Sequence, residues 1–220
     1  MKLDIRKEKG VKGAAEFVAG SILAQLAKGK KVLWLVAGGS SIPVAVAASK
    51  IIRKHPHKKL CVTLTDERYG EVGHSDSNWA KLLARDFKLP QANLKPVLKG
   101  RNMEIAVSAF RTELEKLYKW ADWKIGIFGV GMDGHTAGIL PESDAVSVPR
   151  LAFGYYTEKF NRITMTAKAI GMLDQAVVFS KGEKKRKAIN QLSKNLPVSK
   201  MPAQALKQIP LLTIFLNFKK

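Results

Sequence analysis

The sequence is poor in cysteine and in acidic residues, and it has no long apolar run. Cys61 is the only cysteine among 220 residues, so a disulfide-stabilised secreted scaffold is excluded. Its neighbours Leu60 and Val62 are apolar, which predicts a reduced, buried thiol. No stretch reaches the roughly 18 consecutive apolar residues of a membrane span, and residues 1–10 lack the apolar core of a signal peptide. We therefore expect a soluble, cytoplasmic protein with no membrane partner.

The shortage of acidic residues leaves a formal net charge of +20, from 38 basic and 18 acidic side chains. Such a charge is typical of nucleic-acid-binding proteins, and it also attracts anionic substrates. The excess is mostly lysine, 29 lysines against 9 arginines, spread along the whole chain. Paired Cys and His, RNP-type aromatics and a basic region with heptads are all missing. We expect no specific nucleic acid partner, and a basic, non-enzymatic nucleic-acid-binding protein stays an alternative.

The four histidines do not form a metal-binding pattern. His55 and His57 stand beside lysines or a proline and His74 lies in a polar segment, which predicts three solvated side chains. His135 has no second His or Cys at ligand spacing. The sequence therefore predicts no metal site.

Length and hydrophobic pattern predict one α/β domain over residues 1–220. Apolar runs alternate with amphipathic segments, which favours right-handed crossovers and a doubly wound, largely parallel sheet with helices on both faces. The expected strands are 31–37, 60–65, 124–128, 162–166, 176–180 and 211–216, and the expected helices are 11–28, 43–53, 78–87, 104–120 and 183–193.

Two loops that follow predicted strands carry candidate binding residues, because ligands of such sheets bind beyond the carboxyl ends of the strands. In the first, Gly38, Gly39, Ser40 and Ser41 precede a helix, where backbone N–H groups and hydroxyls form a phosphate cradle or an ordinary capped turn. The spacing of its glycines matches neither the Walker A motif nor the GxGxxG motif. The second, residues 66–68, offers an arginine fork beside two carboxylates, or a self-paired surface turn.

The third loop carries the strongest chemical signal. Residues 129–134 contain three glycines, so the backbone can pass close to a ligand, and His135 follows. A histidine at this edge of the sheet is a candidate general base. Asp133 either orients the imidazole or caps the turn.

Taken together, the loops resemble one family. Residues 38–43 are similar to its GGSTP loop, 66–68 to its DER, 76–78 to its D-x-SN region and 129–141 to its G-x-G-x-DGHTASLFP signature. Residues 162–164 and 182–185 resemble its RIT strand and its G-x-x-K motif. The family is 6-phosphogluconolactonase, within the wider group that includes glucosamine-6-phosphate deaminase/isomerase.

The resemblance implies hydrolysis of 6-phospho-D-glucono-1,5-lactone, a small-molecule substrate, in the oxidative branch of the pentose phosphate pathway, with no cofactor. It implies His135 as the general base, Asp133 as its orienting group and Arg68 or glycine-loop amides such as that of Gly131 at the carbonyl oxygen. The phosphate is expected on the loop of Gly38, Gly39, Ser40 and Ser41, with charge from Arg162 and Lys185. Asp66 is expected to hold Arg68 or a substrate hydroxyl.

The deaminase stays an alternative on the same scaffold. Its pattern reads DGHIAFNEP, with a tyrosine after its DE, whereas this chain has TAGILP after His135 and Arg68 after the acids. A deaminase needs a carboxylate that takes a proton from carbon, and only Asp66 fits that requirement. Ser41, Gly138, Ile139 and Asn217 depart from the lactonase pattern, but the first two keep a hydroxyl and a small residue. The sequence predicts no particular oligomeric state.

Overall fold

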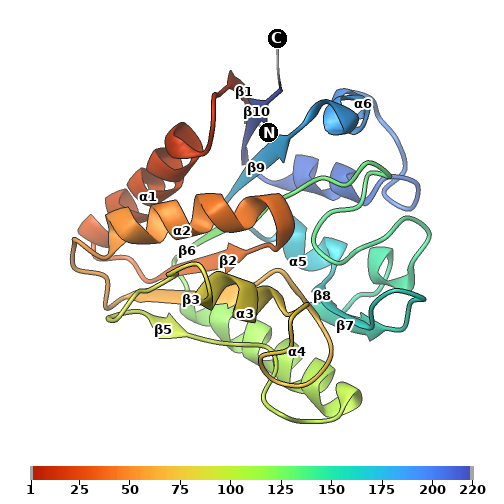
Figure 1. The fold of residues 1–220 in the computed structure, drawn as a ribbon, viewed down its shortest axis with the longest axis horizontal. Helices are drawn as coiled ribbons and strands as arrows, with labels where there is room; N and C mark the ends of the chain where they lie inside the picture. Colours follow the sequence, from red (N-terminus) through yellow and green to blue (C-terminus); the bar gives the residue numbers. More distant parts are fainter. Residues whose placement is uncertain (1, 219–220) are drawn as a thin grey trace.

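Seven strands form a central sheet in the computed structural model, which describes residues 2–218. The strand order is β1-β10-β9-β6-β2-β3-β5, and every neighbouring pair is parallel (Figure 1). The strands are β1 (Lys2–Lys7), β2 (Val32–Val36), β3 (Leu60–Leu64), β5 (Asn93–Leu94), β6 (Trp123–Phe128), β9 (Gln175–Lys181) and β10 (Leu211–Asn217). The predicted α/β fold with a largely parallel sheet is confirmed.

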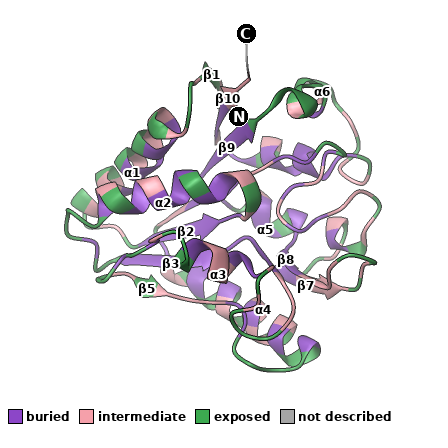
Figure 2. Cartoon of the chain, viewed as in Figure 1, coloured by how far each residue is buried: buried purple, intermediate pink, exposed green. Residues whose placement is uncertain are grey.

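The middle of this sheet is the core of the molecule. All five residues of β2 and all five of β3 are buried, as expected for continuous apolar strands covered on both faces (Figure 2). The Trp34 ring of β2 packs against Phe87 with 5.6 Å between the ring centroids. Cys61 is buried as predicted, and burial raises the pKa of its thiol to about 11.

Helices cover both faces of the sheet. The crossovers from β2 to β3 and from β5 to β6 run in opposite directions along the strand order, which places α2 (Ile42–Ile52) and α4 (Met103–Trp120) on opposite faces (Figure 1). The remaining helices are α1 (Lys12–Ala27), α3 (Asn78–Leu83), α5 (Ala167–Gly171) and α6 (Arg186–Gln191), with 3₁₀ turns at Gly39–Ser41, Asp144–Val146, Glu183–Lys185 and Pro202–Gln208. No helix within residues 2–218 is long and apolar enough to cross a membrane.

A second, antiparallel sheet corrects two sequence-based expectations. Its strand order is β4 (Asp66–Arg68), β8 (Arg162–Met165) and β7 (Ala152–Tyr155). Residues 66–68 were expected as a loop, but they form a strand one residue after β3 ends. Residues 162–166 were expected in the parallel sheet, but they pair with β4 instead. Thr65 joins the two sheets, because its N–H donates to Val36 of β2 and its carbonyl accepts from Met165.

Other predictions were wrong at element ends and at one histidine. The predicted helix 78–87 ends at Leu83, and Asp86 adopts a positive φ of 66° that breaks it. The predicted helix 183–193 begins with a 3₁₀ turn and is helical only over α6. His57 is buried rather than solvated, because His55 O and Gln91 N satisfy its two ring nitrogens at 2.7 and 3.2 Å. Strands β1, β5 and β7 were not predicted.

Candidate active site

A cavity of about 830 Å³ opens at the carboxyl ends of β2, β6 and β9 and is closed on one side by β4 and β8. It brings together most of the residues that the sequence singled out. The predicted site residues that line it are Gly38, Gly39, Ser40, Asp66, Arg68, Gly131, His135, Arg162 and Lys185. Ser41 and Asp133 do not line it. Residues from five separate parts of the chain therefore share one site.

The first wall of the cavity is the loop after β2. Gly39 has a φ of +61°, which favours glycine, and a Cβ on Gly38 would overlap the side chain of Asn78. The loop continues as a 3₁₀ turn into the N-terminus of α2, where the helix dipole favours an anion. Ser40 faces the cavity, but Ser41 is buried. The Ser41 backbone N–H donates to Gly38 O at 3.3 Å. The structure thus offers Gly39 and Ser40 to a ligand rather than Ser41.

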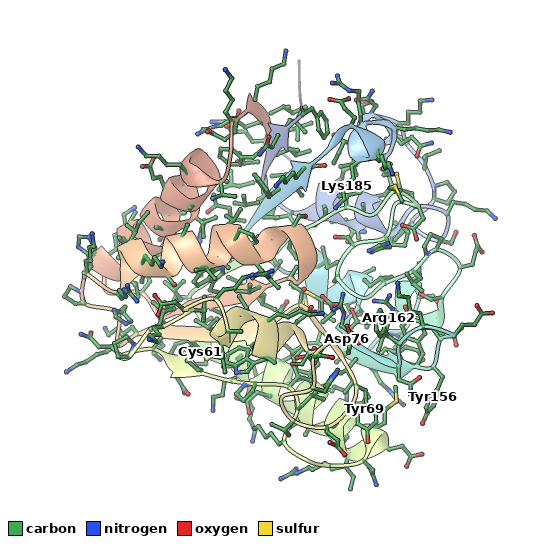
Figure 3. The ribbon with its side chains drawn as sticks, viewed as in Figure 1. Cys61, Tyr69, Asp76, Tyr156, Arg162 and Lys185 are labelled. Carbon is green, nitrogen blue, oxygen red and sulfur yellow. The ribbon has the colours of Figure 1, made fainter. Side chains whose placement is uncertain are left out.

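Lys185 reaches the same loop from the segment between β9 and α6. Its Nζ donates to Ser40 Oγ at 3.5 Å, and burial lowers the pKa of its ammonium group. Figure 3 labels Lys185 and Arg162, which approach the cavity from β9–α6 and from β8 respectively. A cation, a hydroxyl and a helix N-terminus at one place suit an anionic group of a ligand.

His135 and Asp133 form a hydrogen-bonded pair at the edge of the cavity. The distance from His135 Nδ1 to Asp133 Oδ1 is 2.6 Å, and the His135 backbone N–H donates to the same oxygen at 3.2 Å. The hydrogen bond from His135 lowers the pKa of the Asp133 carboxyl to about 2. Because Nδ1 is engaged, Nε2 is the ring nitrogen left for a ligand or a water molecule. Gly131 packs so closely that a Cβ there would overlap both side chains.

Strand β4 places its residues alternately toward the cavity and toward the core. Asp66 and Arg68 line the cavity, while Glu67 is fully buried on the other side. Asp66 was expected to hold Arg68 or a substrate hydroxyl, and within residues 2–218 it forms no ion pair with Arg68. Asp66 instead accepts from Thr65 Oγ1 at 2.9 Å and from Asn78 Nδ2 at 3.3 Å.

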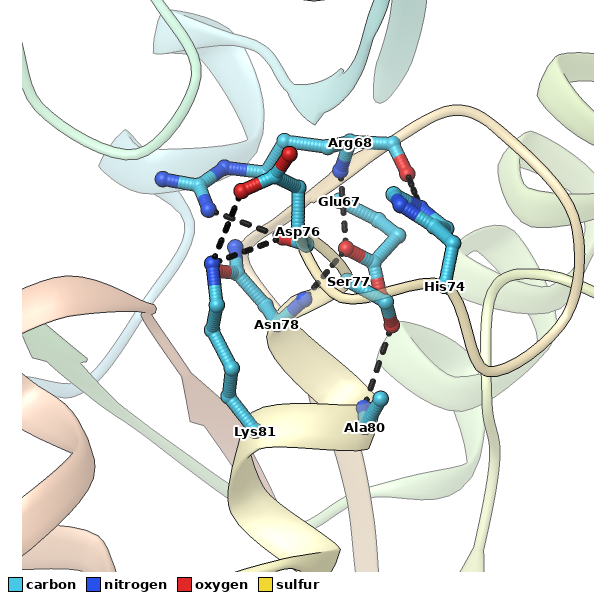
Figure 4. Close-up of polar contacts among 8 residues, drawn as sticks. All are labelled: Glu67, Arg68, His74, Asp76, Ser77, Asn78, Ala80 and Lys81. Carbon is cyan, nitrogen blue, oxygen red and sulfur yellow. Dashed lines mark hydrogen bonds and ion pairs between the residues drawn. The ribbon is translucent and has the colours of Figure 1, made fainter.

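Glu67 anchors this strand to the start of α3, a role that the sequence did not reveal. Its carboxylate accepts hydrogen bonds from Ser77 Oγ and from the backbone N–H groups of Arg68 and Asn78, at 2.6–2.8 Å (Figure 4). The backbone N–H of Trp79 donates to it as well, at 3.0 Å. Burial raises the pKa of Glu67, and these donors oppose that effect. The Arg68 guanidinium, on the cavity side, donates from Nη1 to Asp76 O at 3.0 Å.

The small sheet also supports the turn that follows His135. Tyr155 Oη of β7 donates to Gly138 O, and Thr164 Oγ1 of β8 accepts from Gly138 N at 3.0 Å. A Cβ on Gly138 would press against Thr164 and Asp66. Sequence reasoning missed Tyr155 and Thr164, because nothing in their local pattern signals a contact with residue 138. No cluster of three or more His, Cys, Asp or Glu side chains suited to a metal ion occurs within the described chain.

Comparisons with known proteins show what the chain as a whole is similar to. A family model described as glucosamine-6-phosphate isomerases/6-phosphogluconolactonase matches residues 6–213. The chain is 24% identical over 194 residues to the 6-phosphogluconolactonase of Thermotoga maritima, covering 84% of this chain and 87% of that one. It is 27% identical over 175 residues to the 6-phosphogluconolactonase of Synechocystis, covering 75% and 72%. The crystal structure of a 6-phosphogluconolactonase from Shewanella baltica has the same fold, with a TM-score of 0.79, 21% identity and 97% of each chain covered.

Proposed function

Because this chain belongs to the family of glucosamine-6-phosphate isomerases and 6-phosphogluconolactonases, we propose that it hydrolyses 6-phospho-D-glucono-1,5-lactone to 6-phospho-D-gluconate. The observation that carries the proposal is that His135, paired with Asp133 at the edge of the cavity, lines the same cavity as Lys185 and Ser40. A base at one end and an anion site at the other suit a sugar lactone that carries a phosphate. The protein acts in the cytoplasm, as one domain over residues 1–220.

The chemical step uses His135 as a general base. Nε2 takes a proton from a water molecule as the water oxygen bonds to the lactone carbonyl carbon. The bond between that carbon and the ring oxygen then breaks, and the imidazolium returns the proton to the ring oxygen, which becomes a hydroxyl. Asp133 stabilises the imidazolium because its carboxylate, with a pKa of about 2, is ionised at neutral pH.

Negative charge forms on the carbonyl oxygen during this step, and cavity groups stabilise it. The Gly131 N–H, which the sequence offered for this role, already donates to His135 O at 2.8 Å. Arg68 therefore supplies the stabilising group, a guanidinium that lines the cavity. Such groups lower the barrier most when they are fixed before the reaction. The four hydrogen bonds to Glu67 fix the strand that carries Arg68. The hydroxyls of the substrate have Asp66 as a partner on the same wall.

The phosphate occupies the opposite end of the cavity. Gly38, Gly39 and Ser40 present backbone and hydroxyl groups at the start of α2, and Lys185 and Arg162 supply positive charge. Contacts of this kind hold the substrate equally before and during the reaction. They therefore set KM more than kcat.

A coupled assay tests the proposal. Glucose-6-phosphate dehydrogenase generates the lactone, and formation of 6-phosphogluconate is followed with and without the protein, against the spontaneous rate. We expect acceleration by the wild type and a loss of about 100-fold or more in His135→Ala, the scale of a lost general base. The matched control is His55→Ala, because His55 is an exposed histidine outside the cavity. Full activity in His135→Ala would refute the assignment of the base.

Two further measurements distinguish the lactonase from the alternative functions. Asp66 lines the cavity with a carboxylate, which is the group that a glucosamine-6-phosphate deaminase needs to take a proton from carbon. Release of ammonia from glucosamine 6-phosphate, without lactone hydrolysis, would favour the deaminase. Turnover of neither substrate, together with tight binding of mixed-sequence DNA at physiological salt, would favour a basic nucleic-acid-binding protein.

A further inference from the structure

Two arginines face each other across the small sheet without an acidic partner. Arg68 of β4 and Arg162 of β8 are register partners in the antiparallel pair, and both line the cavity. Like charges at directly opposite positions repel one another. Within residues 2–218 neither guanidinium lies within 4.0 Å of a carboxylate, and the Nε of each is buried without a hydrogen-bond partner. Something other than an acidic side chain holds this pair in place.

The ring of Phe160 lies against both guanidiniums. The Cζ atom of Arg68 is 5.3 Å from the ring centroid, and that of Arg162 is 6.0 Å from it. Lys159 Nζ lies 5.5 Å from the same centroid. Each distance is within the range in which a cation is attracted to an aromatic face. One partly buried ring therefore contacts three cations at the cavity wall.

The segment that carries this ring is itself held in shape. Phe160 precedes β8 in the connection from β7, where its N–H donates to Thr157 Oγ1 at 3.1 Å and its carbonyl accepts from that hydroxyl. Phe160 also lines the cavity. The turn thus fixes the ring beside the guanidiniums rather than leaving it on a free loop.

We propose that Phe160 is a positioning residue for anion binding, whose ring holds Arg68 and Arg162 together at the cavity wall, Arg68 toward the carbonyl or carboxylate end of the ligand and Arg162 toward its phosphate. The proposal rests on the proposed function for the identity of that ligand, a sugar acid or lactone phosphate. An aromatic ring can hold two cations without neutralising them, whereas a carboxylate at this place would compete with the ligand. The cavity thereby keeps its positive charge for the substrate.

The test compares Phe160→Leu, Phe160→Tyr and Phe218→Leu with the wild type. Leu keeps an apolar side chain but has no aromatic face, and Tyr restores the face. Phe218→Leu is the matched control, because the Phe218 ring contacts Arg186 at 5.1 Å but does not line the cavity. Binding of 6-phosphogluconate is measured by calorimetry, with gluconate as the ligand without phosphate, and kcat and KM are measured in the coupled assay.

We expect Phe160→Leu to raise the Kd of 6-phosphogluconate and to lower kcat/KM by about 10-fold each, which corresponds to about 1.4 kcal/mol. Phe160→Tyr and Phe218→Leu should stay within about 2-fold of the wild type. Wild-type binding by Phe160→Leu, or equal losses in Phe160→Tyr, would overturn the proposal. An unchanged melting temperature in Phe160→Leu with weaker binding supports positioning over a merely structural role.

The outcomes also separate this inference from the proposed function. If the wild type does not hydrolyse the lactone but binds 6-phosphogluconate in a manner that depends on the ring, the lactonase assignment fails and the role of Phe160 stands. If the wild type hydrolyses the lactone and Phe160→Leu is fully active with unchanged Kd, the role of Phe160 fails alone.

Discussion

Replacing Asp133 by Asn keeps the size of the side chain but removes its negative charge. Asp133 Oδ1 accepts from both the ring and the backbone of His135. The carboxylate fixes Nδ1 as the protonated nitrogen, so Nε2 can accept a proton from water. An amide NH₂ group at the same place would donate to Nδ1 and favour the tautomer with the proton on Nε2, which is unable to act as a base.

The size of the effect follows from the exposure of the pair. The fall of the Asp133 pKa from 3.8 to about 2 would correspond to about 2.4 kcal/mol if the pair were shielded from solvent. The side chains of His135 and Asp133 are 35% and 51% exposed, so solvent screening reduces the interaction to about 1 kcal/mol. The wrong tautomer adds to this loss. We expect kcat in Asp133→Asn to fall by about 10- to 100-fold, less than in His135→Ala.

The assay measures kcat of both proteins from pH 6 to pH 9 and their unfolding free energy from pH 2 to pH 7. A carboxyl whose pKa is lowered by folding stabilises the fold above its ordinary value near 3.8, and this contribution is lost as pH falls through about 2. The stability difference between wild type and Asp133→Asn should therefore shrink between pH 4 and pH 2. Unchanged kcat with lower stability would show that Asp133 only caps the turn, and would refute the orienting role.

Three further predictions follow from the packing of the site. Gly131→Ala should lower kcat by about 10-fold or more with the fold intact by circular dichroism, because the new Cβ displaces the His135 ring; wild-type kcat would contradict the close approach. Lys185→Ala should raise KM by about 10-fold at nearly unchanged kcat, and a loss confined to kcat would place Lys185 at the reacting carbon instead. Glu67→Gln should lower the unfolding free energy, measured by urea denaturation, by about 2–3 kcal/mol, because the NH₂ group of the new glutamine would face N–H or O–H donors instead of accepting from them. Wild-type stability would show that the Glu67 carboxylate does not accept four hydrogen bonds.

The five inner strands of the central sheet were predictable because they are mostly buried on both faces, whereas the largely exposed edge strands β1 and β5 were not predicted. Continuous apolar runs such as 32–36 and 60–64 predict strands that are covered on both faces. Because such strands run parallel, the residues that follow them lie at one edge of the sheet. That edge brings Gly39 and His135 to one cavity, although they are far apart in the sequence. The motifs identified the loops, and the strand order of the sheet explains why the loops meet.

The small sheet could not be predicted, because it depends on contacts between short segments. Strand β4 has three residues and its partner β8 has four, too few for either to show a clear period. Their pairing decides that Glu67 is buried while Arg68 lines the cavity. Of the two partners expected for Asp66, Arg68 makes no contact with it, because Thr65 and Asn78 donate to its carboxylate instead, and the substrate hydroxyl stays a prediction. His57 was misjudged because its ring partners, His55 O and Gln91 N, are backbone groups.

Net charge and anion recognition are separate properties of this chain. Most of the 38 basic side chains are exposed, where water and salt weaken their attraction for an anion. Lys185 and Arg162 differ from these because they are partly buried, line a cavity and have no ion pair with an acid within residues 2–218. We expect partial desolvation to strengthen their interaction with an anionic group such as phosphate, and their fixed positions to make that interaction selective. We therefore expect the few basic groups held at the carboxyl edge of the sheet, rather than the net charge of +20, to decide where an anionic ligand binds.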